Sequence, residues 1–502
     1  MRTMGSVEQL ELRPPLPVVV GNADYRQYEE RLLRMDELLQ QSGLAAACVE
    51  RCVTQWLQHA RELAVRAGER FREPSAKQMA RYEQMCRQAL RCNLARQWLG
   101  KEYRTFSLRL AESALLQWFC QVARLEQVRV PSKSTLERYD KLLPEADVRE
   151  LVDRLSRVAV EDAQRLELER ALRMDLYLSD TTCIEANIHF PTDWVLLKDA
   201  VRTLMKAVKV IRQHGLKHRM PDPDQFLRQI NRLSIEMGQS RRRPDSAKRR
   251  KSVLRRMKRL TQTVQTHAQR YGQRLQADWR EQTDLHEGEM KRIVARIAGV
   301  ADQLPTAIQQ AHDRIIGGRK PENRDKILSL YEPDVHVIVR HKAGAEVEFG
   351  NTLLLAEQAQ GLIVDWKLHK ASSPGDIALM QASLTRIQQV FGRYPTSVGA
   401  DRGFASKASH LWLETEGIHD AICPRDPREL SERMQDKEFR SIQKRRAQTE
   451  GRIGIVKNAF LGRPLRSKGF AYRELAVTWA VLAHNLWLLA GLPRKPALAN
   501  AA

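Results

Sequence analysis

Two aspartates stand where short β-like segments of the sequence end. Asp180 closes the segment MDLYLSD, and Asp401 closes the segment TSVGAD. Carboxylates at the ends of neighbouring strands can converge on one point. Oxygen ligands of this kind suit two Mg²⁺ or Mn²⁺ ions, which drive in-line phosphoryl transfer. Taken singly, each aspartate is better explained as a loop-opening residue, so the pair needs further support before it indicates a metal site.

A third carboxylate, Glu450, lies in the helical segment QKRRAQTEGRIGIVK. At 100° per residue, one helix face within about 60° carries Gln443, Arg446, Glu450 and Lys457. The acid could ligate a metal ion, while the two cations could hold phosphate oxygens. The alternative is a solvated ion pair between Arg446 and Glu450, which are four residues apart.

The pattern of elements around these residues predicts an α/β core interrupted by a helical insertion. Helical periodicity covers about 25–125, a β-like run begins at Met174, and a long helical stretch follows from about 194 to 324. The strand-like runs VHVIVRHK, VEFGNTLLLAEQ and GLIVDWKLHK come next, then the helix DIALMQASLTRIQQVFG, two short strands and further helices. We therefore divide the chain into a helical region (1–150), a first core part (170–193), the insertion (194–330) and the remaining core with C-terminal helices (331–492).

Residues 106–142 contain a candidate helix-turn-helix. The helical run SLRLAESALLQWFCQVARL is followed by the link VRVPSK and by STLERYDKLL, which we expect Ser134 and Thr135 to cap. In this interpretation Ser134, Thr135 and Arg138 contact DNA. An ordinary antiparallel helix pair is the alternative.

The charge balance points to a polyanionic partner. The 502 residues carry 84 Lys and Arg against 61 Asp and Glu, a net charge of +23. The densest basic segment, 241–259, holds eleven Lys or Arg and one acid, and we expect ordered helices with a cationic face there. Arg249, Arg250, Arg255 and Arg256 are its candidate phosphate contacts.

Several other classes of protein are excluded by pattern. No P-loop, no strand-linked G-x-G-x-x-G and no H-E-x-x-H occurs. Seven scattered cysteines without a C-x-x-C pair argue against a secreted disulfide scaffold. The most apolar stretch, 476–492, is interrupted by His484 and Asn485 and is more typical of a buried helix than of a membrane span. We expect a cytoplasmic, nucleoid-associated protein without a membrane partner.

With these residues in place, the sequence resembles bacterial insertion-sequence transposases of the DDE type, most closely the ISNCY group. The resemblance rests on LSDTTCIEANIHFPTD (178–193), VEFGNTLLLAE (347–357), VGADRGFAS (398–406) and the R-x3-E-x6-K spacing of Arg446, Glu450 and Lys457. The segment 106–139 is also similar to the N-terminal region of this family.

The resemblance implies a ribonuclease H-like core, a mixed sheet with flanking helices, behind an N-terminal all-α DNA-binding region. It implies that Asp180, Asp401 and Glu450 ligate two Mg²⁺ or Mn²⁺ ions, and that Arg446 and Lys457 contact the DNA backbone. Related transposases often have Tyr where this chain has Gln443, so an aromatic contact to a distorted base is not carried over.

Three other acids compete with this triad. Asp365 ends the third predicted strand, whereas a ribonuclease H-like order places the second catalytic aspartate on the fourth, which favours Asp401. Glu185 lies an odd number of residues from Asp180, so in a strand it points to the opposite face. Asp193 precedes a helix and is expected to cap it.

The sequence as a whole predicts a transposase that cleaves double-stranded DNA at terminal inverted repeats and transfers the strand to target DNA. The resemblance implies a homodimer or a larger synaptic assembly. A metal-dependent nuclease without strand transfer and a non-catalytic DNA-binding regulator are the alternatives.

Overall fold

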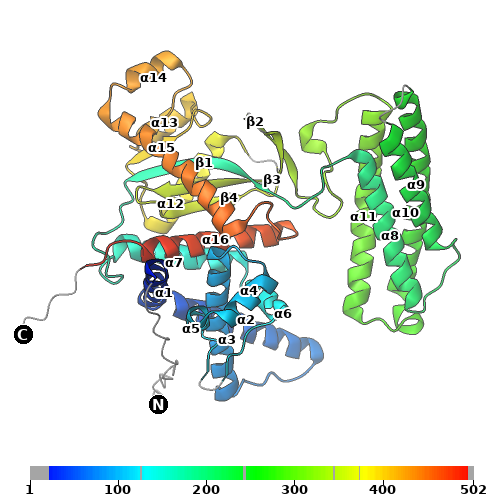
Figure 1. The fold of residues 1–502 in the computed structure, drawn as a ribbon, viewed down its shortest axis with the longest axis horizontal. Coiled ribbons are helices and arrows are strands. Elements are labelled where there is room, and N and C mark those ends of the chain that lie inside the picture. Colours follow the sequence, from blue (N-terminus) through cyan, green and yellow to red (C-terminus); the bar gives the residue numbers. More distant parts are fainter. Residues whose placement is uncertain (1–21, 125–126, 241–244, 343–344, 372–373, 496–502) are drawn as a thin grey trace, which may run out of the picture.

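The computed structural model describes residues 22–124, 127–240, 245–342, 345–371 and 374–495 (Figure 1). Its N-terminal part is a compact group of helices. These are α1 (Ala23–Gln41), α2 (Leu44–Ala67), α3 (Ala76–Trp98), α4 (Tyr103–Glu112), α5 (Ala114–Phe119), α6 (Lys133–Asp140) and α7 (Glu145–Glu161). Helix α7 runs across residue 150, where the sequence suggested a boundary, and ends at Glu161.

A mixed sheet of six strands follows. The strands are β1 (Leu176–Glu185), β2 (His336–Lys342), β3 (Ala345–Gln358), β4 (Ile363–Leu368), β5 (Ser397–Ala400) and β6 (His419–Ile422). Their order is β2-β3-β1-β5-β6, and β4 also pairs with β3. Pairing is antiparallel between β1, β3 and β4 and parallel between β1, β5 and β6. The strands predicted from sequence are therefore confirmed.

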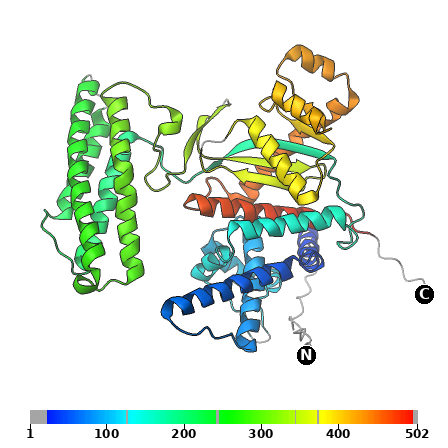
Figure 2. The same cartoon turned by 180° about the vertical axis from the view of Figure 1, so that it is seen from behind.

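The remaining helices surround this sheet. They are α12 (Asp376–Phe391), α13 (Lys407–Thr415), α14 (Pro427–Arg433), α15 (Lys437–Ile455), the π-helix η2 (Val456–Leu461) and α16 (Phe470–Ala490). Helix α15 crosses the sheet face turned to the viewer in Figure 1, and α12 crosses the face seen in Figure 2. Helix α16 lies between the sheet and the N-terminal helices in both views.

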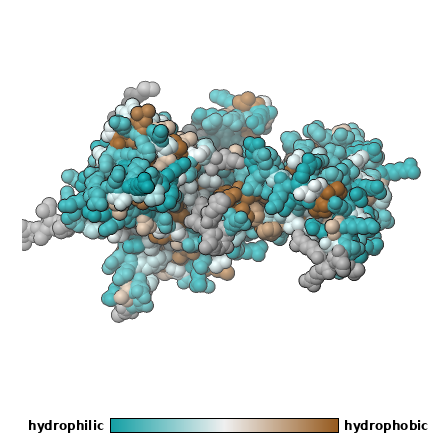
Figure 3. All heavy atoms as spheres, turned by 90° about the horizontal axis from the view of Figure 1, so that it is seen from above, coloured by the Kyte–Doolittle hydropathy of each residue, from teal (hydrophilic) through white to brown (hydrophobic). Residues whose placement is uncertain are grey.

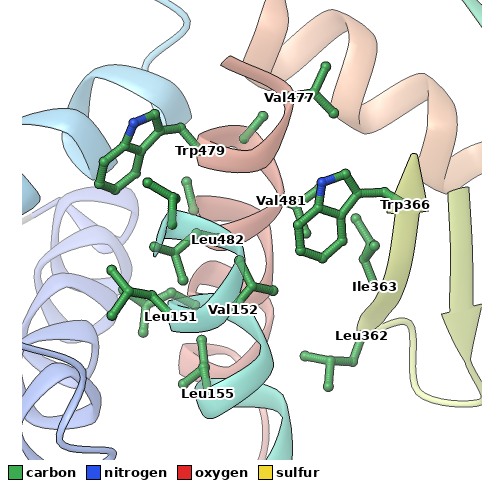
Figure 4. Packing of buried hydrophobic residues seen from close by; sticks show 14 of the residues in the cluster. Leu151, Val152, Leu155, Leu362, Ile363, Trp366, Val477, Trp479, Val481 and Leu482 are labelled. Atoms are coloured by element: carbon green, nitrogen blue, oxygen red, sulfur yellow. The ribbon is translucent and has the colours of Figure 1, made fainter. Parts of the chain in front are cut away.

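Helix α16 is buried along most of its length, as its apolar sequence predicted. Its side chains pack against α7 on one side and β4 on the other, joining the N-terminal helices and the sheet in one hydrophobic core (Figure 4). Two indoles in this core are also hydrogen-bonded: Trp366 Nε1 donates to Thr478 Oγ1 at 3.0 Å, and Trp479 Nε1 donates to the Asp140 carbonyl at 3.3 Å. The N-terminal helices are thus a continuous part of the body that carries the sheet.

The insertion between β1 and β2 is a bundle of four long helices. It consists of α8 (Asp193–Gln213), α9 (Pro223–Ser240), α10 (Ser246–Gln282) and α11 (Glu287–Ile315), followed by the short helix η1 (Asn323–Asp325). The bundle stands to one side of the sheet (Figure 1) and has its own hydrophobic core. The basic segment is helical from Ser246 onward, as expected, while 241–244 lie outside the described residues.

The molecular surface is largely polar. On the face drawn in Figure 3, apolar side chains form small separate patches between hydrophilic ones. Among the described residues, no helix is long and apolar enough to cross a membrane.

Because the bundle has a core of its own, a cavity there should weaken the bundle alone. Leu204 is fully buried in that core, so Leu204→Ala should destabilise the bundle by about 2–5 kcal/mol. Hydrogen exchange should accelerate in α8–α11 and stay unchanged in β1 and β3. Leu482→Ala, in the α16 core, should give the opposite pattern. Equal acceleration throughout the chain in both variants would contradict two separate cores.

Candidate functional site

The sheet brings Asp180 and Asp401 side by side. In the parallel pairing of β1 with β5, Leu178 is opposite Gly399, and the same register continued by two residues places Asp180 opposite Asp401. Residues opposite each other on paired strands share a face of the sheet. Asp401 follows the last residue of β5, as predicted. Asp180 does not end its strand, because β1 continues to Glu185 through its pairing with β3.

Helix α15 covers this face and brings Glu450 and Arg446 to the two aspartates. Phe439 and Ile442 of α15 are buried against Leu176 and Leu178 of β1. Since alternate residues of a strand share a face, Asp180 points to the same side as these leucines. The charges of Arg446 and Glu450 both act on the Asp180 carboxyl. The structure therefore places all four predicted residues in one electrostatic neighbourhood.

The carboxyl group of Asp180 is unusual in its electrostatics. Burial raises its pKa to about 6, and the negative charges of Asp401 and Glu450 act in the same direction. The Thr181 backbone N–H, which donates to Asp180 Oδ1 at 2.7 Å, and the Arg446 guanidinium oppose this rise in pKa. At neutral pH the group is ionised against this penalty, a combination that occurs often at functional sites.

The loop that follows β5 orients Asp401. The Gly403 N–H donates to Asp401 Oδ1 at 2.8 Å, and the Arg425 Nε donates to the Arg402 carbonyl at 3.1 Å. A Cβ at position 403 would lie 2.9 Å from Asp401 Oδ1 and 2.6 Å from the carboxylate of Asp376. A side chain at position 403 would therefore have to displace one or both of these carboxylates.

The three predicted acids do not form a closed metal cage. Among the described residues, no three His, Cys, Asp or Glu side chains are grouped so that they could hold a metal ion. The expectation that the carboxylates surround one point is therefore not met. Their chemistry nevertheless fits Mg²⁺ or Mn²⁺, because all are oxygen donors. A divalent cation would also relieve the repulsion that helps to raise the Asp180 pKa.

Lys457 follows the end of the helix that carries Glu450. Helix α15 ends at Ile455, and Lys457 belongs to the π-helix η2, so the spacing of 100° per residue does not extend as far as Lys457. Its ammonium group is buried and donates to Thr182 Oγ1 at 3.4 Å, and burial lowers its pKa. The structure thus places Lys457 beside Thr182, which lies two residues from Asp180 in β1 and on the same face of the sheet.

The three competing acids have other partners. Asp365 is buried, accepts a hydrogen bond from Ser383 and is paired with Arg386 and Arg149. Glu185 is paired with Arg463. Asp193 is the first residue of α8 and no cap; its Oδ1 accepts from Gln310 Nε2 of α11 at 2.8 Å. We correct the capping prediction accordingly: Asp193 ties two bundle helices together.

The candidate helix-turn-helix differs in detail from its prediction. Ser113 interrupts the first helix, giving α4 and α5, and the link to α6 is longer than expected. The N-cap of α6 is Ser132, whose Oγ accepts from Thr135 N at 3.3 Å, so the predicted cap at Ser134 and Thr135 is wrong. Ser134 and Arg138 are exposed, and Arg138 Nη2 donates to Thr135 Oγ1.

The four candidate arginines of the insertion lie near the beginning of α10. Arg255 and Arg256 are exposed, whereas Arg249 and Arg250 are partly buried. Arg256 is paired with Glu236 of α9 at 3.0 Å. Helix α10 carries eleven Lys or Arg and two acids, so its surface is cationic even with this pair formed.

Sequence analysis missed a buried ion pair behind the site, between Glu357 of β3 and Arg452 of α15. Glu357 interrupts the apolar run LLLAEQ. An acid in a strand that is otherwise buried requires a cationic partner, and this signal could have led to Arg452.

Part of the chain is similar to a known protein family. Residues 330–486 match the family model described as Transposase DDE domain. No curated protein and no solved structure matches the chain. The matched range contains Asp401 and Glu450, while Asp180 and the bundle precede it. The match supports a DDE transposase family.

The raised pKa of Asp180 predicts a gain in stability when its charge is removed. The protonated form is favoured in the folded protein, so this group stabilises below its unfolded pKa of 3.8, and the effect is lost as pH rises through about 6. At pH 8, Asp180→Asn should therefore stabilise the protein by up to about 3 kcal/mol. Thermal unfolding at pH 8 and pH 4 measures this difference, which should shrink at pH 4.

Asp365→Asn is the matched control for this experiment. It should destabilise the protein, since it leaves two arginines without their buried carboxylate. Destabilisation by both variants at pH 8 would show that the charge of Asp180 does not destabilise the folded protein.

Proposed function

We propose that this protein is an insertion-sequence transposase that cuts DNA at the ends of its element and transfers the cut strand to a target. Two observations support the proposal. The charges of Asp401 and Glu450 act on the Asp180 carboxyl, and residues 330–486 match a transposase DDE domain. The motifs that resemble the ISNCY group support that type. Joining two ends requires a dimer or a larger synaptic assembly, acting at bacterial DNA.

We further propose a ribonuclease H-like core. Leaving β2 aside, the strand order β4-β3-β1-β5-β6 supports it, with three antiparallel strands followed by two parallel ones. Asp180 then lies on the first strand of this order and Asp401 at the end of the fourth. The bundle enters after the first strand.

In this proposal Asp180, Asp401 and Glu450 hold two Mg²⁺ or Mn²⁺ ions, which supply Lewis acidity at the scissile phosphate. Because the pKa of Asp180 is about 6, this carboxyl group is ionised at neutral pH. Arg446 lies close enough to affect this pKa and would hold a phosphate oxygen of the bound strand. Lys457, which donates to Thr182, would contact the DNA backbone.

Variants of the three acids test the proposal. Asp180→Asn, Asp401→Asn and Glu450→Gln should each abolish cleavage of an end-containing duplex in Mg²⁺ while leaving DNA affinity largely intact. Cleavage by Glu450→Gln near the wild-type rate would remove Glu450 from the site. Cleavage without joining to target DNA in the wild-type protein would indicate the alternative, a nuclease. Binding without any cleavage would indicate a regulator.

DNA binding is divided, in this proposal, between the bundle and the N-terminal helices. Changing Arg249, Arg250, Arg255 and Arg256 to Gln should flatten the dependence of log affinity on log salt by up to about 3–4 units, since each phosphate contact contributes about 0.9. Preference for the element end over random duplex should stay unchanged. Titrations at several salt concentrations with both duplexes measure these two quantities.

The reciprocal control is Arg138→Ala, at an exposed position of α6. It should reduce preference for the element end and change the salt dependence by about one unit at most. An unaltered salt dependence combined with lost end preference in the four-arginine variant would show that the bundle reads sequence instead.

A further inference from the structure

Helix α15 carries a second polar face, directly opposite the one that bears Glu450. At 100° per residue, Arg445, Gln448 and Arg452 lie about 180° from the centre of the face that carries Gln443 and Glu450. All three side chains contact the end of β3 and the turn that follows it. The rotation of α15 about its axis is thus constrained from the side that faces away from Glu450.

The contacts are specific. Arg452 Nε and Gln448 Nε2 both donate to Glu357 Oε2, each at 3.0 Å. Gln448 Nε2 also lies 3.4 Å from the Gln358 carbonyl, and Arg445 donates to the Ala359 carbonyl. Three consecutive residues, the last two of β3 and the first of the turn after it, therefore hold three side chains of one helix face.

Burial makes the central pair hard to rearrange. Glu357 is completely buried and the Arg452 side chain is 14% exposed, so both charges are largely shielded from water. Removing one member of such a pair leaves an uncompensated buried charge, which is strongly destabilising. The pair thus fixes a geometry more firmly than a surface ion pair does.

The network continues from Arg452 into the core. Arg452 Nη1 lies 3.0 Å from His484 Nε2, and His484 Nδ1 lies 3.1 Å from Asn485 Oδ1. With Arg452 as donor, His484 is neutral and carries its proton on Nδ1; burial lowers its pKa to about 4. Asn485 then bonds both the N–H and the carbonyl of Ile363 in β4. One chain of hydrogen bonds joins β3, α15, α16 and β4.

The β3–β4 turn is shaped to admit this guanidinium. Gly361 has φ +91°, and a Cβ there would overlap the guanidinium of Arg452. A glycine is required at this position both by its backbone conformation and by the side chain that lies against it.

We propose that the Glu357–Arg452 pair, with Gln448, is a positioning device that sets the rotation of α15 and so presents Glu450 to Asp180 and Asp401. The catalytic part of this inference rests on the proposed function. The positioning part concerns the chain alone and can be measured without DNA or metal.

A double-variant cycle tests it. Glu357→Gln and Arg452→Met alone should lower thermal stability, whereas the double variant removes both charges and should recover it. In the double variant, hydrogen exchange in α15 should remain faster than in wild type. Cleavage at saturating DNA should remain about 10²-fold slower, because small displacements of a reacting group are that costly. Affinity for the end duplex should be unchanged.

Gln448→Ala is a second variant that retains the ion pair. It should fold normally and show faster exchange in α15 with a smaller loss of cleavage. The matched control is the double variant Asp36→Asn with Arg91→Met, another buried pair, between α1 and α3. It should leave cleavage at saturating DNA and exchange in α15 unchanged.

Wild-type exchange and wild-type cleavage in both the double variant and Gln448→Ala would overturn the positioning role. A wild-type protein that cleaves no element-end DNA would overturn the proposed function instead. In that case, hydrogen exchange in α15 of the variants would still test the positioning role.

Discussion

The pairing of β1 on both of its edges is the constraint on which the candidate site depends. Nine antiparallel pairs hold β1 to β3, and three parallel pairs hold it to β5. The second pairing aligns Asp180 with Asp401, and the first fixes Glu357, which anchors α15 from behind. Since α15 packs on the leucines of the same strand, every acid of the site takes its position from β1.

Asp365 and Asp180 lie on opposite faces of this sheet and have different surroundings. Asp365, turned towards α12, is surrounded by Ser383, Arg386 and Arg149. Asp180, turned towards α15, has two further acids in its surroundings. The first arrangement satisfies a buried charge and the second leaves repulsion between carboxylates. A fold selected only for stability would favour the first on both faces.

Much of this architecture could be predicted from the sequence, because strand and helix periods are local. The alternation around Asp180 and Asp401 and the apolar run of α16 each indicated the right element. The position of Asp180 within its strand could not be predicted, because it depends on how far β3 pairs along β1. The change from α-helix to π-helix before Lys457 was not predicted. Arg452 was missed because its partner is 95 residues away.

The bundle has a consequence for how the chain folds. Strands β1 and β3 must pair across 165 residues, counted from Glu185 to its partner Gly350. Closing such a loop as flexible chain costs roughly 4–5 kcal/mol of entropy. The contacts within the bundle span shorter sequence separations than this pairing, so the bundle can form first. Their formation would bring the ends of the intervening chain together and reduce the closure cost by about 1 kcal/mol. The insertion thus assists the long-range pairing that it interrupts.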